Sequence, residues 1–377
     1  MTRRILLPLL CLAALLAFPR PAASQVTPAQ ASTPPNDTQS ISVGATIFYD
    51  YTVQTTPKVK DGNNPANDVT FSAFQVQRSY INVTGNISHL ISFRITPDIR
   101  QDTNAAAGDV LSGSLVFRIK YSYAQFNLDQ YTGNWKANWV KLGIQQTPYL
   151  DYSEGIYRYR FQGTMFVERV GAFASADAGV SYHTNFPNNF GDFHAGFFNG
   201  ENYNGIEPND QKAFMLRGTV RPFGRSAPEY RGWRVTGFWD NDAPNKGGRR
   251  DRGIFQTTYE HKYFTFGYEY LNRNDQTNGT DKNVDVNAKG WSIWATPFFH
   301  EKGNGPELLF RYDDYKVNKD IDAIQKRTIV GFAWWFPHPG GNATAALMLD
   351  YDGLTGSGSQ NTLVNNKKWA LHGLINF

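Results

Sequence analysis

Apolar and polar residues alternate along nearly the whole chain, and this two-residue period constrains the fold more than any other feature. From Ile41 to Val53 every odd position is apolar or aromatic, and from Trp369 to Phe377 every odd position is apolar except for Gly373. Such a period is typical of a β-strand, because successive side chains of a strand point to opposite faces. Each such segment therefore has one apolar face that must be covered.

Segments with this period recur to the end of the chain and are separated by turn residues. We predict strands at residues 41–53, 69–84, 87–100, 112–128, 137–147, 177–186, 190–200, 211–222, 231–240, 251–261, 263–273, 287–299, 307–316, 324–336, 342–353 and 365–377. Short links fall at 85–86, 187–189, 262 and 337–341, and longer polar loops at 54–68, 101–111, 148–176, 241–250, 274–286 and 354–364. Short turns and longer loops at opposite ends are typical of outer-membrane β-barrels.

The composition supports a membrane-spanning barrel. Aromatic residues make up 15% of the chain, yet the mean hydropathy is -0.48. A soluble β-sandwich is the alternative, but it does not account for aromatic alternation over all these segments. We therefore predict an all-β fold: a transmembrane antiparallel β-barrel of about sixteen strands over residues 41–377, with a constriction loop.

The first residues predict export. Residues 1–24 have a basic start, an apolar centre and small residues before Gln25, which is the pattern of a signal peptide. A membrane anchor is the alternative, but the apolar run is shorter than the roughly 20 residues a spanning helix needs. Cys11, the single cysteine, lies within this run, and residues 25–40 are expected to form a flexible segment.

The last strand predicts both closure and location. An apolar strand that ends in Phe377 can pair with the first strand, which removes the free sheet edges. A terminal strand of this kind also resembles the signal that the outer-membrane assembly machinery recognises. We therefore expect the chain in the bacterial outer membrane, surrounded by its lipids.

Charge placement gives the expected lining of the barrel. Removal of the expected signal peptide takes away Arg3, Arg4 and Arg20 and leaves 34 basic and 33 acidic residues. A net charge of about +1 gives no general attraction for nucleic acid. If the apolar face of each strand meets lipid, the other face lines the lumen. The basic residues assigned to this lumen wall are Arg94, Arg100, Arg118, Lys120, Lys141, Arg217, Arg221, Arg234, Arg311 and Arg327, with acids Asp98, Asp240, Glu260, Glu269 and Asp313 among them. In the strand that contains Arg118, we expect Tyr121 and Tyr123 to point outward and Ser122 inward.

The longest loop, residues 148–176, lacks a regular period and is expected to be functional. We predict that it folds into the lumen and sets the narrowest point, with an outward-folded surface loop as the alternative. The charged residues expected at this constriction are Arg158, Arg160 and Arg169, countered by Glu154 and Glu168 and also by Asp151. Lining arginines and lysines favour anions, although each of them could instead serve a structural ion pair.

Residues 137–222 resemble the phosphate-selective porin O and P family. The matching motifs are Lys141-Leu142-Gly143, Pro148, Glu168-Arg169, Gly179-Val180-Ser181-Tyr182 and Gly196-Phe197-Phe198-Asn199-Gly200. The resemblance implies a sixteen-stranded porin, generally a homotrimer, with a loop-lined constriction. It also implies passive diffusion of small hydrophilic solutes with a preference for anions, phosphate or similar. The mixed wall leaves a general non-selective porin as the alternative.

No enzyme motif accompanies the barrel pattern. The chain has no G-x-S-x-G, H-E-x-x-H, Walker or C-x-x-C motif, so we expect neither catalysis nor a cofactor. His183 and His194 are expected to face each other across a hairpin, but two histidines alone do not predict a metal site. A non-conducting receptor or adhesin barrel is the second alternative.

Overall fold

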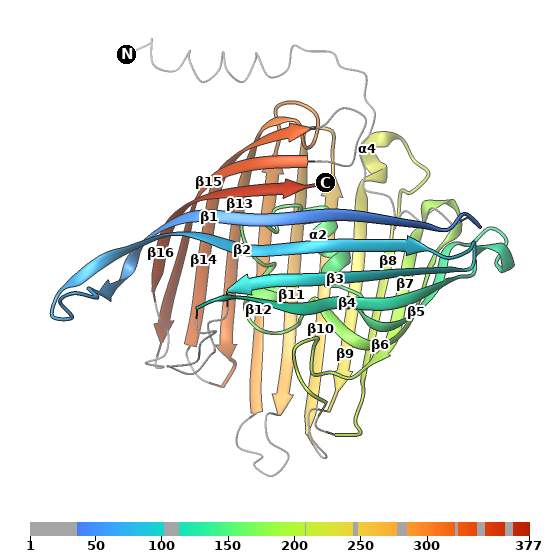
Figure 1. Ribbon diagram of the computed structural model, residues 1–377, viewed down its shortest axis with the longest axis horizontal. Helices are drawn as coiled ribbons and strands as arrows, with labels where there is room; N and C mark the ends of the chain where they lie inside the picture. Colours follow the sequence, from blue (N-terminus) through green and yellow to red (C-terminus); the bar gives the residue numbers. More distant parts are fainter. Residues whose placement is uncertain are drawn as a thin grey trace.

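The computed structural model describes residues 36–101, 113–207, 209–243, 248–276, 285–320, 323–337, 344–358 and 365–377. Over these ranges, sixteen antiparallel strands form one closed barrel (Figure 1). Each strand pairs with its neighbours in the sequence, and the last strand pairs with the first. The expected signal peptide at 1–24 and residues 25–35 of the expected flexible segment lie outside the described residues.

Each predicted strand overlaps one observed strand, so the predicted antiparallel barrel of sixteen strands is confirmed. The strands are β1 (Ser40–Lys60), β2 (Asp68–Asn86), β3 (Ile91–Gln101), β4 (Leu115–Asn127), β5 (Lys136–Gln146), β6 (Ala176–Asn185), β7 (Gly191–Phe198), β8 (Ala213–Val220), β9 (Trp233–Asp242), β10 (Arg249–Glu260), β11 (Phe264–Gln276), β12 (Asp285–Pro297), β13 (Gly305–Asn318), β14 (Ala323–Pro337), β15 (Thr344–Gly358) and β16 (Asn366–Asn376). The short helices are η1 (Asp129–Tyr131), α2 (Leu150–Tyr157), α3 (Phe166–Arg169), η2 (Pro187–Asn189) and α4 (Pro228–Arg231). None of the helices in the described ranges is long and apolar enough to cross a membrane.

Strands β1 and β16 close the barrel in the way the C-terminal sequence predicts. Their register runs from Thr46 opposite Asn376 to Val53 opposite Trp369. The backbone of Phe377 adds two further hydrogen bonds to Ala45, each with an N···O distance of 3.0 Å. No free edge is left between these two strands, which is the condition for placing a sheet in lipid.

The outer face of the barrel is apolar and the inner face is polar. Along β14, Phe332 and Trp334 are exposed, whereas Ala333 between them is completely buried. Along β15, Leu347 and Leu349 are exposed, and the alternate positions Asp350 and Asp352 are buried inside. An apolar outer surface around a polar interior is the arrangement of a transmembrane barrel.

The predicted alternation is wrong in the second half of β4. Tyr121 was expected to face outward but is buried inside, and Ser122 was expected inside but is exposed. The register shifts here, because Thr96 lies opposite Tyr121 and Pro97 lies opposite Ile119, which leaves Lys120 as an extra residue in β4. A β-bulge of this kind reverses the facing of every residue that follows it. Tyr123, also expected outside, therefore faces the interior.

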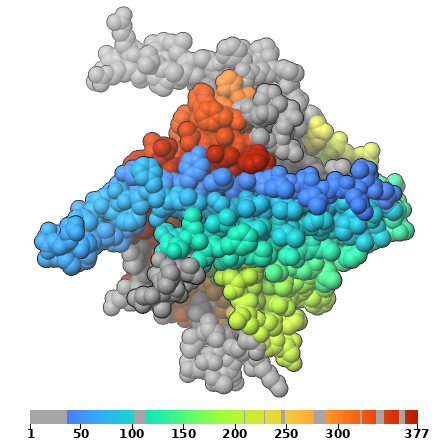
Figure 2. Space-filling model, viewed as in Figure 1, coloured from blue at the N-terminus to red at the C-terminus, as the bar shows by residue number. Residues whose placement is uncertain are grey.

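The N-terminal hairpin is longer than predicted. The predicted loop at 54–68 consists largely of strand, and the β1–β2 hairpin extends well beyond the rest of the barrel (Figures 1 and 2). At its other end, residues 36–39 are held on the turn between β2 and β3. The Asn86 amide donates to the Thr38 carbonyl at 3.0 Å, and the His89 ring contacts the Asp37 carboxylate at 2.6 Å.

Substituting Gly373 should weaken the closing seam. A Cβ atom at Gly373 would overlap the ring of Tyr49 on β1. We expect Gly373→Val to lower the free energy of unfolding by about 1–3 kcal/mol, because overpacking displaces well-packed side chains. Gly237→Val is the matched control, since a Cβ there meets no atom within 4 Å. Urea titration in lipid vesicles, followed by tryptophan fluorescence, measures both, and equal losses would contradict the packing explanation.

Candidate functional site

The segment that joins β5 to β6, residues 147–175, lies within the barrel and is called the inner segment here. It includes α2 and α3, and Figure 1 shows α2 between the walls. Its residues contact strands on widely separated parts of the wall. Pro148 accepts a hydrogen bond from Arg217 of β8 at 2.7 Å, and Gln162 donates one to Asp350 of β15 at 2.8 Å.

The sequence YRYRF at 157–161 explains how part of the inner segment is held. Its aromatic residues Tyr157, Tyr159 and Phe161 are buried, whereas the two intervening arginines stay partly exposed. The Tyr157 ring meets Trp294 edge-on at 5.1 Å, and the Tyr159 ring meets Trp335 at 5.6 Å. Aromatic pairs of this geometry contribute about 0.5–1.5 kcal/mol beyond the area they bury. The alternation therefore buries the aromatic residues that anchor the segment and leaves the two arginines partly exposed.

Three of the five predicted constriction residues come together on the inner segment. Arg160 forms ion pairs with Glu154 at 2.8 Å and Glu168 at 3.5 Å. Burial raises the pKa of Glu154 above its ordinary value, although Arg160 lowers it in part. The inner segment thus carries a compact cluster of one cation and two carboxylates.

The other two predicted constriction residues lie apart from this cluster and bind the wall. Arg158 pairs with Glu307 of β13 at 2.6 Å and stacks over the Trp335 ring at 4.7 Å. Arg169 pairs with Asp352 of β15 at 3.0 Å. Sequence reasoning missed both wall carboxylates as partners, although their inward parity on β13 and β15 was a usable signal.

Four of the predicted wall arginines are covered. Arg217, Arg221, Arg234 and Arg311 point inward, as parity predicts, but their side chains are almost completely buried. Arg234 pairs with Glu260 at 2.5 Å and Arg311 with Asp313 at 2.8 Å, while Arg217 pairs with Asp192. A covered ion pair cannot line an open passage. These arginines therefore support the wall and the inner segment.

A different arrangement holds the cations of β3, β4 and β5. Arg94 lies 4.7 Å from the ring centre of Tyr121, Lys120 lies 4.7 Å from that of Tyr80, and Lys141 lies 4.2 Å from that of Trp139. None of these three cations, nor Arg100, has a carboxylate of the described residues within ion-pair distance. Aromatic faces hold them in place without neutralising them, although the Glu154 carboxylate partly compensates Lys120 from beyond ion-pair distance.

The remaining predicted wall cations share carboxylates. Arg118 pairs with Asp98 at 2.8 Å, and Asp98 also pairs with Arg78 of β2, which sequence reasoning missed. Arg327 pairs with Asp352 at 2.7 Å, the same carboxylate that binds Arg169. One carboxylate between two arginines leaves a local excess of positive charge at both places.

A cavity of about 750 Å³ lies beside the inner segment. It is lined by Glu154, Arg158, Arg160, Lys302 and Trp335, together with Thr46, Thr344 and Asn376 from the wall strands β1, β15 and β16. The cavity is open, and its lining combines charged and aromatic side chains. It places partly exposed cations of the inner segment beside space that a hydrated solute can occupy.

His183 and His194 face each other across the β6–β7 hairpin, as predicted. His183 bonds to the Ala137 carbonyl at 2.8 Å, and His194 to the Ser181 hydroxyl at 3.1 Å. The Trp139 ring stacks on His183 at 4.9 Å. Within the described part of the chain, no group of three or more His, Cys, Asp or Glu residues could hold a metal ion.

Removing the charge of Arg217 should loosen the inner segment. This buried guanidinium binds Asp192 and the Pro148 carbonyl, so Arg217→Met would remove the permanent positive charge beside the buried Asp192 carboxylate and leave it the His183 ring at 3.5 Å. We expect the free energy of unfolding to fall by about 3–5 kcal/mol. The control is Lys326→Met, which breaks the exposed pair with Asp314 and should cost about 1 kcal/mol or less. Similar losses in the two variants, measured by urea titration, would argue against an anchoring role for Arg217.

Comparison with known proteins identifies the fold. No family model and no curated protein sequence matches the chain. Among solved structures, an anion-selective porin from Comamonas acidovorans matches with a TM-score of 0.60 and 14% identity, over 90% of this chain and 100% of that chain. The outer membrane channel DcaP of Acinetobacter baumannii matches with a TM-score of 0.58 and 9% identity, over 93% and 100%. OmpF of Salmonella typhi matches with a TM-score of 0.58 and 12% identity, over 89% and 97%. The chain therefore has the fold of the outer-membrane porins.

Proposed function

We propose that the chain is a porin of the bacterial outer membrane that lets small hydrophilic solutes diffuse passively and favours anions, phosphate or similar ions among them. The observation that carries the anion preference is the uneven pairing of the inner charges. Arg94, Lys120 and Lys141, on β3 to β5, are held by aromatic rings. By contrast, Arg217 and Arg311, on β8 and β13, are each paired with a carboxylate, Asp192 and Asp313.

This unevenness gives one side of the interior a positive potential. In a confined lumen, an uncompensated cation lowers the barrier for an entering anion and raises it for a cation. Asp98 and Asp352, each shared by two arginines, add to the positive excess. The mixed pairing elsewhere supports a moderate preference for anions. It does not form the dense row of unpaired basic residues that strong phosphate selectivity would require.

The inner segment is the proposed constriction. It contacts strands on several sides of the barrel and presents Arg158 and Arg160 beside the open cavity. Glu154 and Glu168 outnumber Arg160 in this cluster, so their protonation state sets its net charge. Diffusion through such a passage requires no catalytic group and no cofactor.

The proposed cellular context follows from the two ends of the chain and from the porin fold. Residues 1–24 would direct export and be removed, and the strand that ends in Phe377 would be recognised by the outer-membrane assembly machinery. We further propose a homotrimer. One similar structure, OmpT of Vibrio cholerae, is described as a trimer form, and it matches with a TM-score of 0.55 and 11% identity.

Planar-bilayer recording of the purified protein under a KCl gradient tests the proposal. We expect discrete channels whose reversal potential favours chloride, and added phosphate should reduce the current. Large channels without selectivity or block would indicate a general porin. Absence of channels from folded protein would contradict a conducting function and favour a receptor or adhesin.

Neutralising the cations stacked on aromatic rings should reduce the anion preference. We expect Lys120→Gln to lower the chloride-to-potassium permeability ratio about fourfold, since a charge roughly 10 Å from the ion path changes the barrier of each ion by about 0.4 kcal/mol even in water, in opposite directions for chloride and potassium. Adding Arg94→Gln and Lys141→Gln should lower it further. Lys326→Gln, which removes an exposed lysine paired with Asp314, is the matched control and should leave the ratio unchanged. An unchanged ratio in the triple variant would contradict the proposed origin of selectivity.

The anion preference should increase on acidification. Burial raises the pKa of Glu154, so this carboxylate takes up a proton at a higher pH than an ordinary glutamate. Its loss of negative charge as pH falls leaves Arg160 less compensated, and the permeability ratio should rise. In Glu154→Gln the ratio should already be high at neutral pH, and its rise on mild acidification should be smaller. Reversal potentials of both proteins, measured between neutral and mildly acidic pH, test whether Glu154 causes this pH dependence. An identical pH response in the variant would contradict a role for Glu154.

A further inference from the structure

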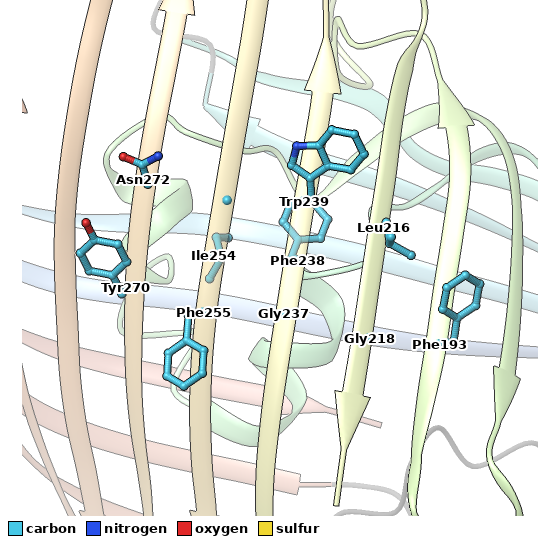
Figure 3. A pocket seen from close by; sticks show the side chains of 11 residues that line it. Phe193, Leu216, Gly218, Gly237, Phe238, Trp239, Ile254, Phe255, Tyr270 and Asn272 are labelled. Carbon is cyan, nitrogen blue, oxygen red and sulfur yellow. The ribbon is translucent and has the colours of Figure 1, made fainter.

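The outer wall carries a groove of about 600 Å³ across β7 to β11. Its floor is formed by Gly218, Gly237 and Gly253, and a Cβ atom at any of them would meet no atom within 4 Å. Gly218 lies directly opposite Gly237 in the register of β8 and β9. Figure 3 shows the side chains around this floor, which are chiefly aromatic: Phe193, Trp239, Phe255 and Tyr270.

The groove belongs to the outer face and is separate from the proposed passage. Arg217, next to Gly218, points inward and is fully buried. Trp239 and Phe255, on either side of the glycine floor, are exposed on the outside. In a membrane this surface meets lipid, and the missing side chains leave room for an apolar chain.

A cluster of three lysines adjoins one end of the groove. Asn272, which lines the groove, lies opposite Gly253 on one side and opposite Lys289 on the other. Lys289 lies opposite Lys316 of β13, and the Lys319 ammonium donates to the Asn272 side chain at 2.6 Å. The groove and the lysine cluster are therefore continuous through Asn272.

This lysine cluster keeps a net positive charge. Among the described residues, none of its three lysines has a carboxylate within ion-pair distance. Burial and the neighbouring Lys289 lower the pKa of Lys319, while Asp320 partly opposes the shift. Other nearby acids on the outer face are already paired, Asp314 with Lys326 and Asp251 with Arg249. Like charges directly opposite each other destabilise a sheet, so an anion on this patch would relieve the repulsion.

We propose that this outer surface binds an anionic lipid that carries a phosphate headgroup, from the leaflet at the long-loop end of the barrel. The lysines contact the phosphate, and one acyl chain lies along the glycine floor. Lysines near a membrane surface attract anionic headgroups, and aromatic side chains such as Tyr270 favour the interfacial level just below. The site is independent of which solute passes through the barrel.

Native mass spectrometry of the purified full chain in detergent tests the site, with phosphatidylglycerol as the probe and phosphatidylcholine as the zwitterionic comparison. We expect phosphatidylglycerol to be retained more strongly. Lys289→Gln and Lys316→Gln should each weaken its binding about fivefold. Gly237→Leu, which fills the groove without contacting other residues at its Cβ, should weaken both lipids. Lys262→Gln, in the short turn between β10 and β11 at the other end of these strands, is the matched control and should bind like the unchanged chain.

Each other result would overturn the proposal. Equal retention of the two lipids would remove the role of the lysines. Unchanged lipid binding in Gly237→Leu would remove the role of the groove. If that variant instead altered the oligomeric state and left lipid binding intact, the groove would be a contact between copies of the chain. Folding of every variant is checked by the urea midpoint.

Discussion

The need to satisfy every backbone hydrogen bond within lipid governs this structure. An apolar medium offers no partner for a free N–H or C=O group, so a sheet can cross it only when its two edges meet. Here the meeting edges are β1 and β16, and the terminal residue Phe377 extends their pairing to Ala45. Closure then divides the side chains into two sets, because alternate residues of every strand must face either lipid or the interior.

The interior accommodates its charges in two ways. Arg217 and Arg234 are covered and each binds a carboxylate, since an unpaired buried charge is strongly destabilising. Lys120 and Lys141 are buried as well, but their ammonium groups lie on aromatic rings. On β3 to β5, aromatic rings support the cations and no described carboxylate neutralises them. The proposed selectivity depends on this second arrangement, because positive charge persists only there and beside shared carboxylates.

The sequence predicts the fold well because the alternation is repeated in every strand. It predicts which residues face inward, including the covered Arg311 and the partly exposed Arg327. It fails at Tyr121 and Tyr123, because a bulge at Lys120 depends on the register between β3 and β4 and leaves no mark in the period. Parity places the ion-pair partners of Arg158 and Arg169 on the inner face, but it does not say which arginine each of them binds. Glu307 and Asp352 are more than a hundred residues away in the chain, and only the path of the inner segment brings them close.

The two faces of the wall carry separate proposed roles that share the same strands. Arg217 and Gly218 are neighbours on β8, yet one anchors the inner segment and the other forms the floor of the outer groove. The sequence does not reveal the groove, because the pairing of β8, β9 and β10 is needed to bring three isolated glycines together, Gly218 opposite Gly237 and Gly253 opposite Trp239. Both roles thus arise from cross-strand register rather than from any local motif.

The position of the inner segment in the path of solutes is tested most directly by chemical modification. Cys11 is the single cysteine and lies in the expected signal peptide, so a processed chain gives a clean background. The test variant is Gly155→Cys, since Gly155 lines the open cavity, and the control is Gly237→Cys on the outer wall. A bulky thiol reagent is added to each variant during single-channel recording. The current should fall sharply in Gly155→Cys and stay constant in Gly237→Cys. Unchanged current in Gly155→Cys, with labelling verified by mass, would contradict a constriction formed by this segment.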